Sequence, residues 1–126
     1  MKRIVTASII FIFIISSCIT AFVFIKNKTN EFSDILQNAY TQAKSNNKDE
    51  SIAQIDNFIK RWHKSEKYLM LLINREYIDE ITVASQTLNQ YLRYEEYPEF
   101  FAEIKKVMAL LNHMLDTEMP QLRNIF

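Results

Sequence analysis

Few side chains in this sequence are suited to chemistry: one cysteine, Cys18, and two histidines, His63 and His113. Neither histidine has a partner at the spacing of an HExxH zinc motif, in which two histidines one helical turn apart hold the metal. Glycine is absent, and both the nucleophile elbow of serine hydrolases and the phosphate-cradling loops of nucleotide-binding proteins require it. We therefore expect no enzyme activity, no catalytic residue, no metal site and no cofactor.

Cys18 ends the tetrapeptide at residues 15–18, Ile-Ser-Ser-Cys, which resembles the lipobox of bacterial lipoproteins. A basic start at residues 1–3 and an apolar core precede it, as in that class of proteins. The resemblance implies cleavage before Cys18 and lipid attachment to its thiol. Mature lipoproteins usually continue with a polar tether, whereas here the apolar run extends to Ile25. Cys18 is therefore a candidate lipid-attachment residue, and the alternative is a small hydrophobe within an apolar helix.

One cluster of basic residues surrounds the single tryptophan, Trp62. Its members are Lys60, Arg61, His63, Lys64 and Lys67. Such a run is most often the solvated face of an amphipathic helix, which is the interpretation we favour; the alternative is contact with phosphate headgroups or an acidic partner. The acidic pairs at 79–80 and 95–96 are interpreted in the same way. Trp62 itself falls at core spacing, which favours packing over ligand stacking.

The charge distribution argues against a nucleic-acid partner. Residues 1–28 hold four basic residues and no acidic one, whereas residues 29–126 hold 11 basic residues against 15 acidic ones. The larger part is therefore net negative, and nucleic acid requires a basic face. The basic residues of the N-terminal part can instead meet the headgroups of membrane lipid.

The elements that position these residues begin with an apolar stretch, 4–25, which contains no charged residue, glycine or proline. As a helix, its 22 residues reach roughly 33 Å, enough to cross the hydrocarbon core of a bilayer. Its hydroxyl groups can bond to carbonyls one turn back and are then tolerated in lipid. The run is longer than the core of a cleaved signal peptide. We therefore favour the interpretation that residues 1–28 form an uncleaved membrane anchor.

Positive charge on either side of the anchor sets the expected orientation. Lys2, Arg3 and the α-amine precede it, and Lys26 and Lys28 follow it. This slight excess on the N-terminal side favours a single-pass protein of the cell membrane with a cytoplasmic N-terminus. Residues 29–126 then form an extracytoplasmic domain.

Residues 29–126 predict a small antiparallel helical bundle. Four apolar stripes recur at three- and four-residue steps, and short polar links separate them. The stripes consist of Phe32, Ile35, Leu36, Ala39, Tyr40 and Ala43; of Ile52, Ile55, Phe58, Ile59, Trp62, Leu69, Leu72 and Ile73; of Ile78, Ile81, Ala84, Leu88, Tyr91 and Leu92; and of Phe100, Phe101, Ile104, Val107, Met108, Leu111, Met114 and Leu115. The expected fold class is all-α, a single transmembrane helix followed by this bundle. The first bundle helix is either fused to the anchor or capped separately at Thr29.

Polar residues mark the ends of the first two bundle helices. The turn at 45–48 ends the first, and Asn47 with Glu50 has the spacing of a capping box at the start of the second. Glu66 is the only polar residue at a stripe position of the second helix, which leaves room for a bend or break at 64–67.

The ends of the last two helices are marked in the same way. Asn74 can cap the third helix, residues 93–97 form the next connection, and Pro98 suits the first turn of the fourth helix. We expect Pro120 to end that helix. The tail is expected to fold back onto the bundle through Leu122, Ile125 and Phe126.

The whole layout resembles a family of small uncharacterised bacterial proteins, the domain of unknown function DUF4363. The likeness rests on the basic start, the single apolar helix, Trp62 late in a helix, the segment 72–81 and the ending at 124–126. It implies an anchored helical topology and no reaction, and it implies a source among spore-forming Gram-positive bacteria, of which members of the family are typical. Cys18 has no counterpart in the resemblance.

Two functions are compatible with these patterns. The first is a membrane-tethered interaction module of the cell envelope, without catalytic activity, that docks another membrane or envelope protein. The second is a ligand-binding or sensory bundle, with a small molecule between helices near Trp62 and the tyrosines Tyr91, Tyr94 and Tyr97. A hydrophobic cavity lined by a few polar groups favours the second function.

Overall fold

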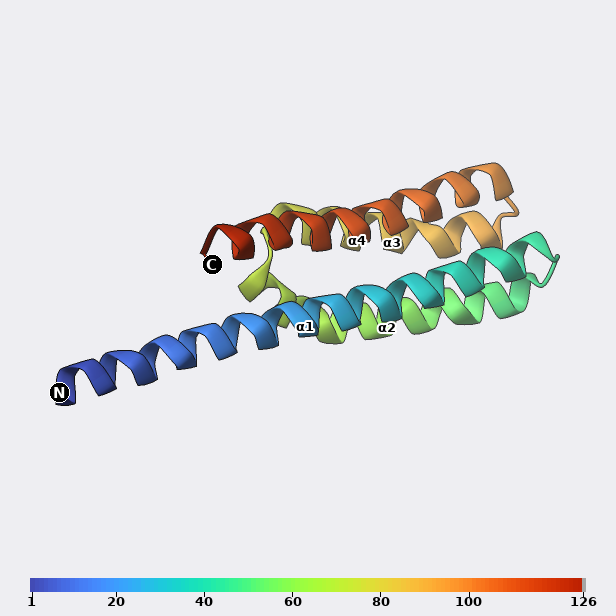
Figure 1. The fold of residues 1–126 in the computed structure, drawn as a ribbon. Coiled ribbons are helices and arrows are strands. Elements are labelled where there is room, and N and C mark those ends of the chain that lie inside the picture. Colours follow the sequence, from blue (N-terminus) through green and yellow to red (C-terminus); the bar gives the residue numbers. More distant parts are fainter. Residues whose placement is uncertain (126) are drawn as a thin grey trace.

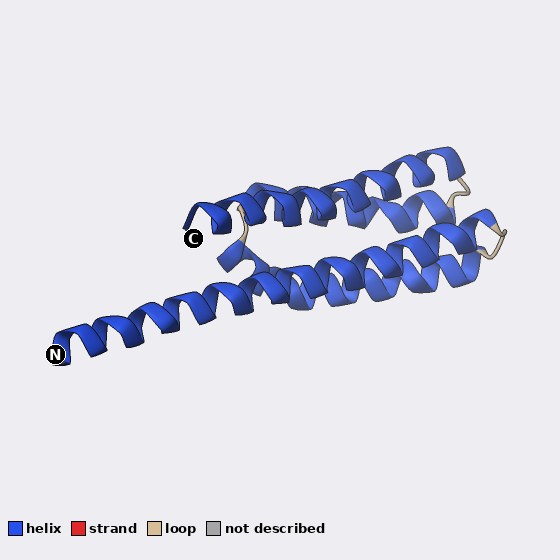
Figure 2. Cartoon of the chain, in the orientation of Figure 1, coloured by secondary structure: helices blue, strands red, loops and turns tan. Residues whose placement is uncertain are grey.

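The structure, a computed structural model, consists of α-helices joined by short turns (Figures 1 and 2). The helices are α1 (Lys2–Lys44), α2 (Lys48–Leu72), α3 (Arg75–Arg93) and α4 (Tyr97–Ile125). The structure describes the backbone of residues 1–125 and the side chains of residues 1–114 and 116. No β-strand occurs in this part of the chain, and the predicted all-α class is confirmed.

The four helices run alternately in opposite directions and form a bundle (Figure 1). Each helix packs against two others, because α1 and α3 both contact α2 and α4. The N-terminal end of α1 projects beyond the other helices (Figure 1). The predicted layout, one long apolar N-terminal helix followed by a helical bundle, is therefore confirmed.

α1 is one unbroken helix of 43 residues, in which the apolar stretch and the first bundle helix are fused. A separate cap at Thr29 does not occur, since Thr29 lies within the helix and is only 1% exposed. Ile25, the last residue of the apolar stretch, already belongs to the buried core. The packing of the C-terminal half of α1 therefore fixes the direction in which the apolar half projects.

The predicted stripes form the hydrophobic core. Among the side chains that the structure describes, every stripe residue is buried or half-buried except Leu72, which is 37% exposed. Trp62 is buried, with its ring centroid 5.5 Å from that of Phe32 and 6.1 Å from that of Phe58. The prediction that Trp62 is a core residue is confirmed.

α2 is continuous across residues 64–67, where the sequence left room for a break. Glu66 does not interrupt the helix because its carboxylate has partners: His63 Nδ1 lies 3.3 Å from Oε2, and Thr82 Oγ1 lies 3.1 Å from Oε1. The single proton of Thr82 Oγ1 is shared between this carboxylate and the Ile78 carbonyl, which is 2.9 Å away. Trp62 Nε1 donates in turn to Thr82 Oγ1 at 2.8 Å. This polar chain joins α2 to α3 and explains why a carboxylate occupies a stripe position.

The capping predictions have mixed outcomes. Asn74 caps α3 as predicted, because its side chain accepts a hydrogen bond from the Glu76 amide at 3.1 Å. Asn47 occupies the N-cap position of α2, but its side chain makes no capping hydrogen bond, so the predicted capping box is wrong. Asn47 Nδ2 donates instead across the turn to Gln42 Oε1 at 2.9 Å. Pro98 lies in the first turn of α4, as predicted.

The turns after α1 and α3 manage without glycine. Asn46 and Glu95 adopt left-handed backbone conformations, with φ of 63° and 57°. The amide of the following residue, Asn47 or Glu96, donates to a helix carbonyl five residues earlier, at 2.9 and 2.8 Å. These bonds are those of the Schellman motif, which ends a helix with one residue in the left-handed conformation. That residue is usually glycine.

Pro120 does not end α4, contrary to the sequence prediction, because the helix runs on to Ile125. A proline removes one backbone donor and crowds the carbonyl four residues earlier, but its own φ of about −65° is helical, so a helix can pass through it. The expected fold-back of the tail concerns the side chains of Leu122, Ile125 and Phe126, which lie outside the described residues.

Candidate functional site

The N-terminal half of α1 exposes apolar side chains on all its sides. Only 6% of its most apolar 18-residue window is buried. The exposed large side chains are Ile4, Val5, Ile9, Ile10, Phe11, Ile12, Phe13, Ile14, Ile19 and Val23. A core helix of a soluble protein would bury such a surface, whereas α1 is long and apolar enough to cross a membrane.

Four of the five hydroxyl groups of this half are satisfied within the helix. Thr6, Ser8, Ser17 and Thr20 each donate a hydrogen bond to the carbonyl four residues earlier, at 2.8 to 2.9 Å. A hydroxyl without a partner is costly to bury in hydrocarbon. These four bonds are the back-bonds that the sequence analysis predicted, and they lower the cost of placing this half in lipid.

Cys18, the candidate lipid-attachment residue, lies within the apolar half of α1 as a half-buried free thiol. The helix continues without interruption on both sides of it. Lipid attachment at Cys18 stays a prediction.

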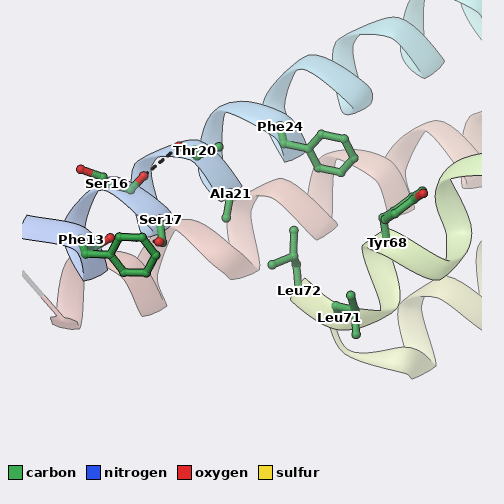
Figure 3. A pocket seen from close by; sticks show the side chains of 9 residues that line it. All are labelled: Phe13, Ser16, Ser17, Thr20, Ala21, Phe24, Tyr68, Leu71 and Leu72. Atoms are coloured by element: carbon green, nitrogen blue, oxygen red, sulfur yellow. Dashed lines mark hydrogen bonds between the residues drawn. The ribbon is translucent and has the colours of Figure 1, made fainter. Parts of the chain in front are cut away.

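Where α1 leaves the bundle, it forms an apolar groove with the C-terminal end of α2 (Figure 3). The groove has a volume of about 690 Å³. Figure 3 shows Leu72 pointing from α2 towards α1. Leu71 is 82% exposed and Tyr68 is 53% exposed, so the bundle presents apolar surface beside the apolar half of α1. The groove is lined by Phe13, Ser16, Ser17, Thr20, Ala21 and Phe24 of α1 and by Tyr68, Leu71 and Leu72 of α2.

A polar pocket of about 310 Å³ lies farther along the same two helices. Arg61 forms an ion pair with Glu31, and Lys28 Nζ lies 3.4 Å from the same carboxylate. Partial burial raises the pKa of Glu31, but the hydrogen bond from Arg61 and the charge of Lys28 outweigh it, so the pKa lies below its ordinary value of 4.5. The pocket is lined by Lys28, Glu31, Asn57, Lys60, Arg61, Lys64 and Ser65. Four cationic residues therefore surround one ionised carboxylate.

The groove between α3 and α4 has the opposite charge. It has a volume of about 310 Å³ and includes the carboxylates of Asp79, Glu80 and Glu103 against one ammonium group, that of Lys106. Val83, which is 63% exposed, lies among them. The two pockets therefore differ in charge, the one between α1 and α2 being basic and the one between α3 and α4 acidic.

The other candidates from the sequence have structural or solvated positions. The whole basic cluster around Trp62 is exposed, as predicted for a solvated face. His63 contacts Glu66, and His113 is exposed on α4. In the described part of the chain, His, Cys, Asp and Glu side chains do not gather into groups of three that could hold a metal ion.

The apolar groove is not where the ligand hypothesis placed a cavity. Trp62 is packed in the core, and Tyr94 is exposed at the turn after α3. Sequence reasoning missed Tyr68 and Leu71 because both lie off the apolar stripe of α2. A signal was available, since residues 68–72 read Tyr-Leu-Met-Leu-Leu, which is apolar on more faces than a bundle core can bury.

The fold and this site define a class of protein: a four-helix bundle whose first helix extends into an exposed apolar rod long enough to cross a membrane. Within that class, the chain belongs to the family described as a domain of unknown function, DUF4363, whose family model matches residues 19–125. The resemblance noted from the sequence is therefore confirmed. No curated protein and no solved structure matches the chain.

Proposed function

We propose that the chain is a single-pass membrane protein whose bundle stands on the outer face of the cell membrane and docks another membrane or envelope protein. The observation that carries this proposal is the exposed apolar half of α1, in which four of the five hydroxyl groups are bonded to the backbone of the same helix. Such a surface is stable in lipid and unstable in water. The charge excess of Lys2, Arg3 and the α-amine supports a cytoplasmic N-terminus.

The polar groups of the bundle support a structural module rather than an enzyme. The buried indole of Trp62, the hydroxyl of Thr82 and the carboxylate of Glu66 are used to join two helices. The acidic groove between α3 and α4, with exposed Val83 among carboxylates, offers a docking surface to a partner with basic and apolar side chains.

Co-purification tests the docking function. The full-length chain is extracted from membranes in a mild detergent, and proteins that remain bound are identified. We expect a membrane or envelope protein that is retained by the wild type and lost from a Glu80→Lys/Glu103→Lys variant. A chain that is solitary in both forms would contradict the proposal.

Intact mass measurement of the membrane-extracted chain distinguishes the anchor from the lipoprotein alternative. An uncleaved anchor gives the mass of all 126 residues. A lipoprotein gives the mass of residues 18–126 plus a diacylglyceryl group on Cys18. A cleaved, secreted domain gives a smaller mass without lipid, and that result would contradict both forms of membrane attachment.

A second candidate function, ligand binding, is favoured by one observation, the apolar groove of about 690 Å³ between α1 and α2. Its test is thermal unfolding of the detergent-purified chain, followed by the fluorescence of Trp62, with and without added amphiphiles. A ligand that binds the folded chain raises the unfolding temperature, and the rise grows with the logarithm of the ligand concentration once that concentration exceeds the Kd. No shift with any amphiphile would remove this candidate.

A further inference from the structure

The apolar groove and the basic pocket are parts of one continuous surface. On α1 the groove residues Thr20 and Phe24 are followed at helical spacing by the pocket residues Lys28 and Glu31. On α2 the sequence runs the opposite way, so Leu72 and Tyr68 of the groove lead up to Lys64 and Arg61 of the pocket. The seam between α1 and α2 is therefore apolar beside the C-terminal end of α2 and cationic farther into the bundle.

The level of this seam follows from the length of the apolar stretch. If the hydrocarbon layer of the bilayer ends near Ile25, where the core of the bundle begins, then Ala21 lies roughly 6 Å inside that layer. Leu72 lines the groove together with Ala21, so the end of α2 lies in the outer part of the hydrocarbon layer. Lys28 lies roughly 4.5 Å above Ile25, at the level of lipid phosphates.

The residues that follow Leu72 limit this depth. Asn74, Arg75 and Glu76 are exposed and polar, and they begin α3. They keep this corner, the turn from α2 to α3, at the boundary between hydrocarbon and headgroups. Tyr68, with the Lys67 ammonium 5.2 Å from its ring centroid, is the kind of pair that is enriched at this boundary.

We propose that the seam between α1 and α2 binds an anionic phospholipid of the outer leaflet. One acyl chain lies in the groove against Phe24, Leu71 and Leu72, and the headgroup phosphate contacts Lys28, Lys60 and Lys64. Charge complementarity selects the occupant, because Glu31 is paired with Arg61 and no ion pair in the described part of the chain involves Lys60 or Lys64. The inference rests on the proposed membrane location and adds a specific lipid partner to it.

The depth of the corner is tested with nitroxide spin labels on the full-length chain in bilayers of phosphatidylcholine and phosphatidylglycerol. Single cysteines replace Phe11, Leu71 and Tyr94 in a Cys18→Ser background; these side chains are 63%, 82% and 78% exposed, so labelling disturbs no packing. Collisions with oxygen report lipid, and collisions with a water-soluble nickel chelate report water.

We expect the labels at Phe11→Cys and Leu71→Cys to report lipid and the label at Tyr94→Cys to report water. A lipid signal at position 11 with a water signal at position 71 would overturn the lipid-binding inference and leave the anchor intact. A water signal at position 11 would overturn the proposed membrane location, and the inference with it. The two failures are therefore distinguishable.

The headgroup contact is tested by the lipids that stay bound. The full-length chain is released from bilayers with equal amounts of the two phospholipids, and retained lipids are counted by native mass spectrometry. We expect enrichment of phosphatidylglycerol in the wild type, falling about fivefold for each lysine removed in a Lys60→Gln/Lys64→Gln variant. The matched control, Lys105→Gln/Lys106→Gln on α4, removes the same charge and should keep the enrichment. Equal retention of the two lipids by the wild type, or an enrichment that the Lys60→Gln/Lys64→Gln variant keeps, would overturn the headgroup contact.

Discussion

The two halves of α1 share one uninterrupted helix and have opposite surroundings. From Ile25 to Ala43 one stripe of the helix is buried against α2 and α4, and the other sides are polar. From Ile4 to Phe24 the helix is apolar on every side and largely exposed. The comparison teaches that helix formation alone does not distinguish an anchor from a bundle helix. The number of apolar faces does, because a bundle can bury one face and a bilayer can cover all of them.

The largest expected effect comes from placing charges in the exposed half. An Ile10→Arg/Ile14→Arg variant puts two guanidinium groups near the bilayer centre, at about 2.5 to 3.5 kcal/mol each. We expect it to lose retention in membranes washed at alkaline pH. The matched variant in the other half, Gln37→Arg/Asn38→Arg on the exposed face, should be retained like the wild type. Equal retention of both variants would show that the two halves of α1 tolerate charged side chains equally well.

Removing an aromatic ring should affect the stability of the bundle only when the ring lies in the buried half of α1. Phe32 is fully buried and packs edge-on against Phe58 with centroids 5.4 Å apart, so Phe32→Ala should lower the free energy of unfolding by about 3 to 5 kcal/mol. Phe11→Ala in the exposed half should change it by less than about 0.5 kcal/mol. Denaturant unfolding in detergent, followed by Trp62 fluorescence, measures both. A large loss for Phe11→Ala would mean that the exposed half packs on the bundle.

The polar link inside the bundle should have an intermediate effect. Thr82→Val leaves the Trp62 indole without its acceptor and Glu66 Oε1 without the Thr82 hydroxyl, at a cost of about 1 to 3 kcal/mol. Thr41→Val is the control, because Thr41 is exposed and bonds only to the Gln37 carbonyl. The same unfolding assay applies, and equal effects of the two substitutions would remove the structural role assigned to this link.

The smallest expected effect is the pH dependence of the ion pair beside the groove. The pKa of Glu31 is lower in the folded chain than in the unfolded chain, so its stabilising contribution is present above the ordinary pKa and is lost as the pH falls through the folded pKa. A partly exposed pair of this kind contributes about 1 kcal/mol or less. Wild type should therefore exceed Glu31→Gln in unfolding midpoint at about pH 6, and the difference should shrink as the pH falls below the ordinary pKa and disappear below the folded pKa of Glu31. A difference that persists at low pH would rule out the charge as its cause.

The helical stripes and the apolar stretch could be predicted because each depends on local spacing. The sequence places Trp62, Leu88 and Ile104 at core positions, and all three are buried. It could not predict why Glu66 is tolerated, because its partner Thr82 lies 16 residues away on another helix. Asn47 shows the same limit at a cap, where Gln42 competes for its side chain.

The candidate site was predictable in part. The exposed apolar half of α1 and the back-bonds of four of its hydroxyl groups follow from residues 4–25 alone. The groove does not, because it requires knowing that α2 ends beside Ala21 rather than above Ile25. That register depends on the turn at 45–47 that joins the two helices and on how α2 packs against α1, which is a relation between two helices rather than a local pattern.

Labelling of intact cells with a membrane-impermeant maleimide tests whether the chain is held in the membrane with its bundle outside. The chain carries Tyr94→Cys in a Cys18→Ser background, and the membranes are washed at alkaline pH before analysis. We predict that the chain stays in the membrane pellet and that position 94 is labelled without lysis. Release of the chain by the wash, or labelling only after the cells are broken, would contradict the account.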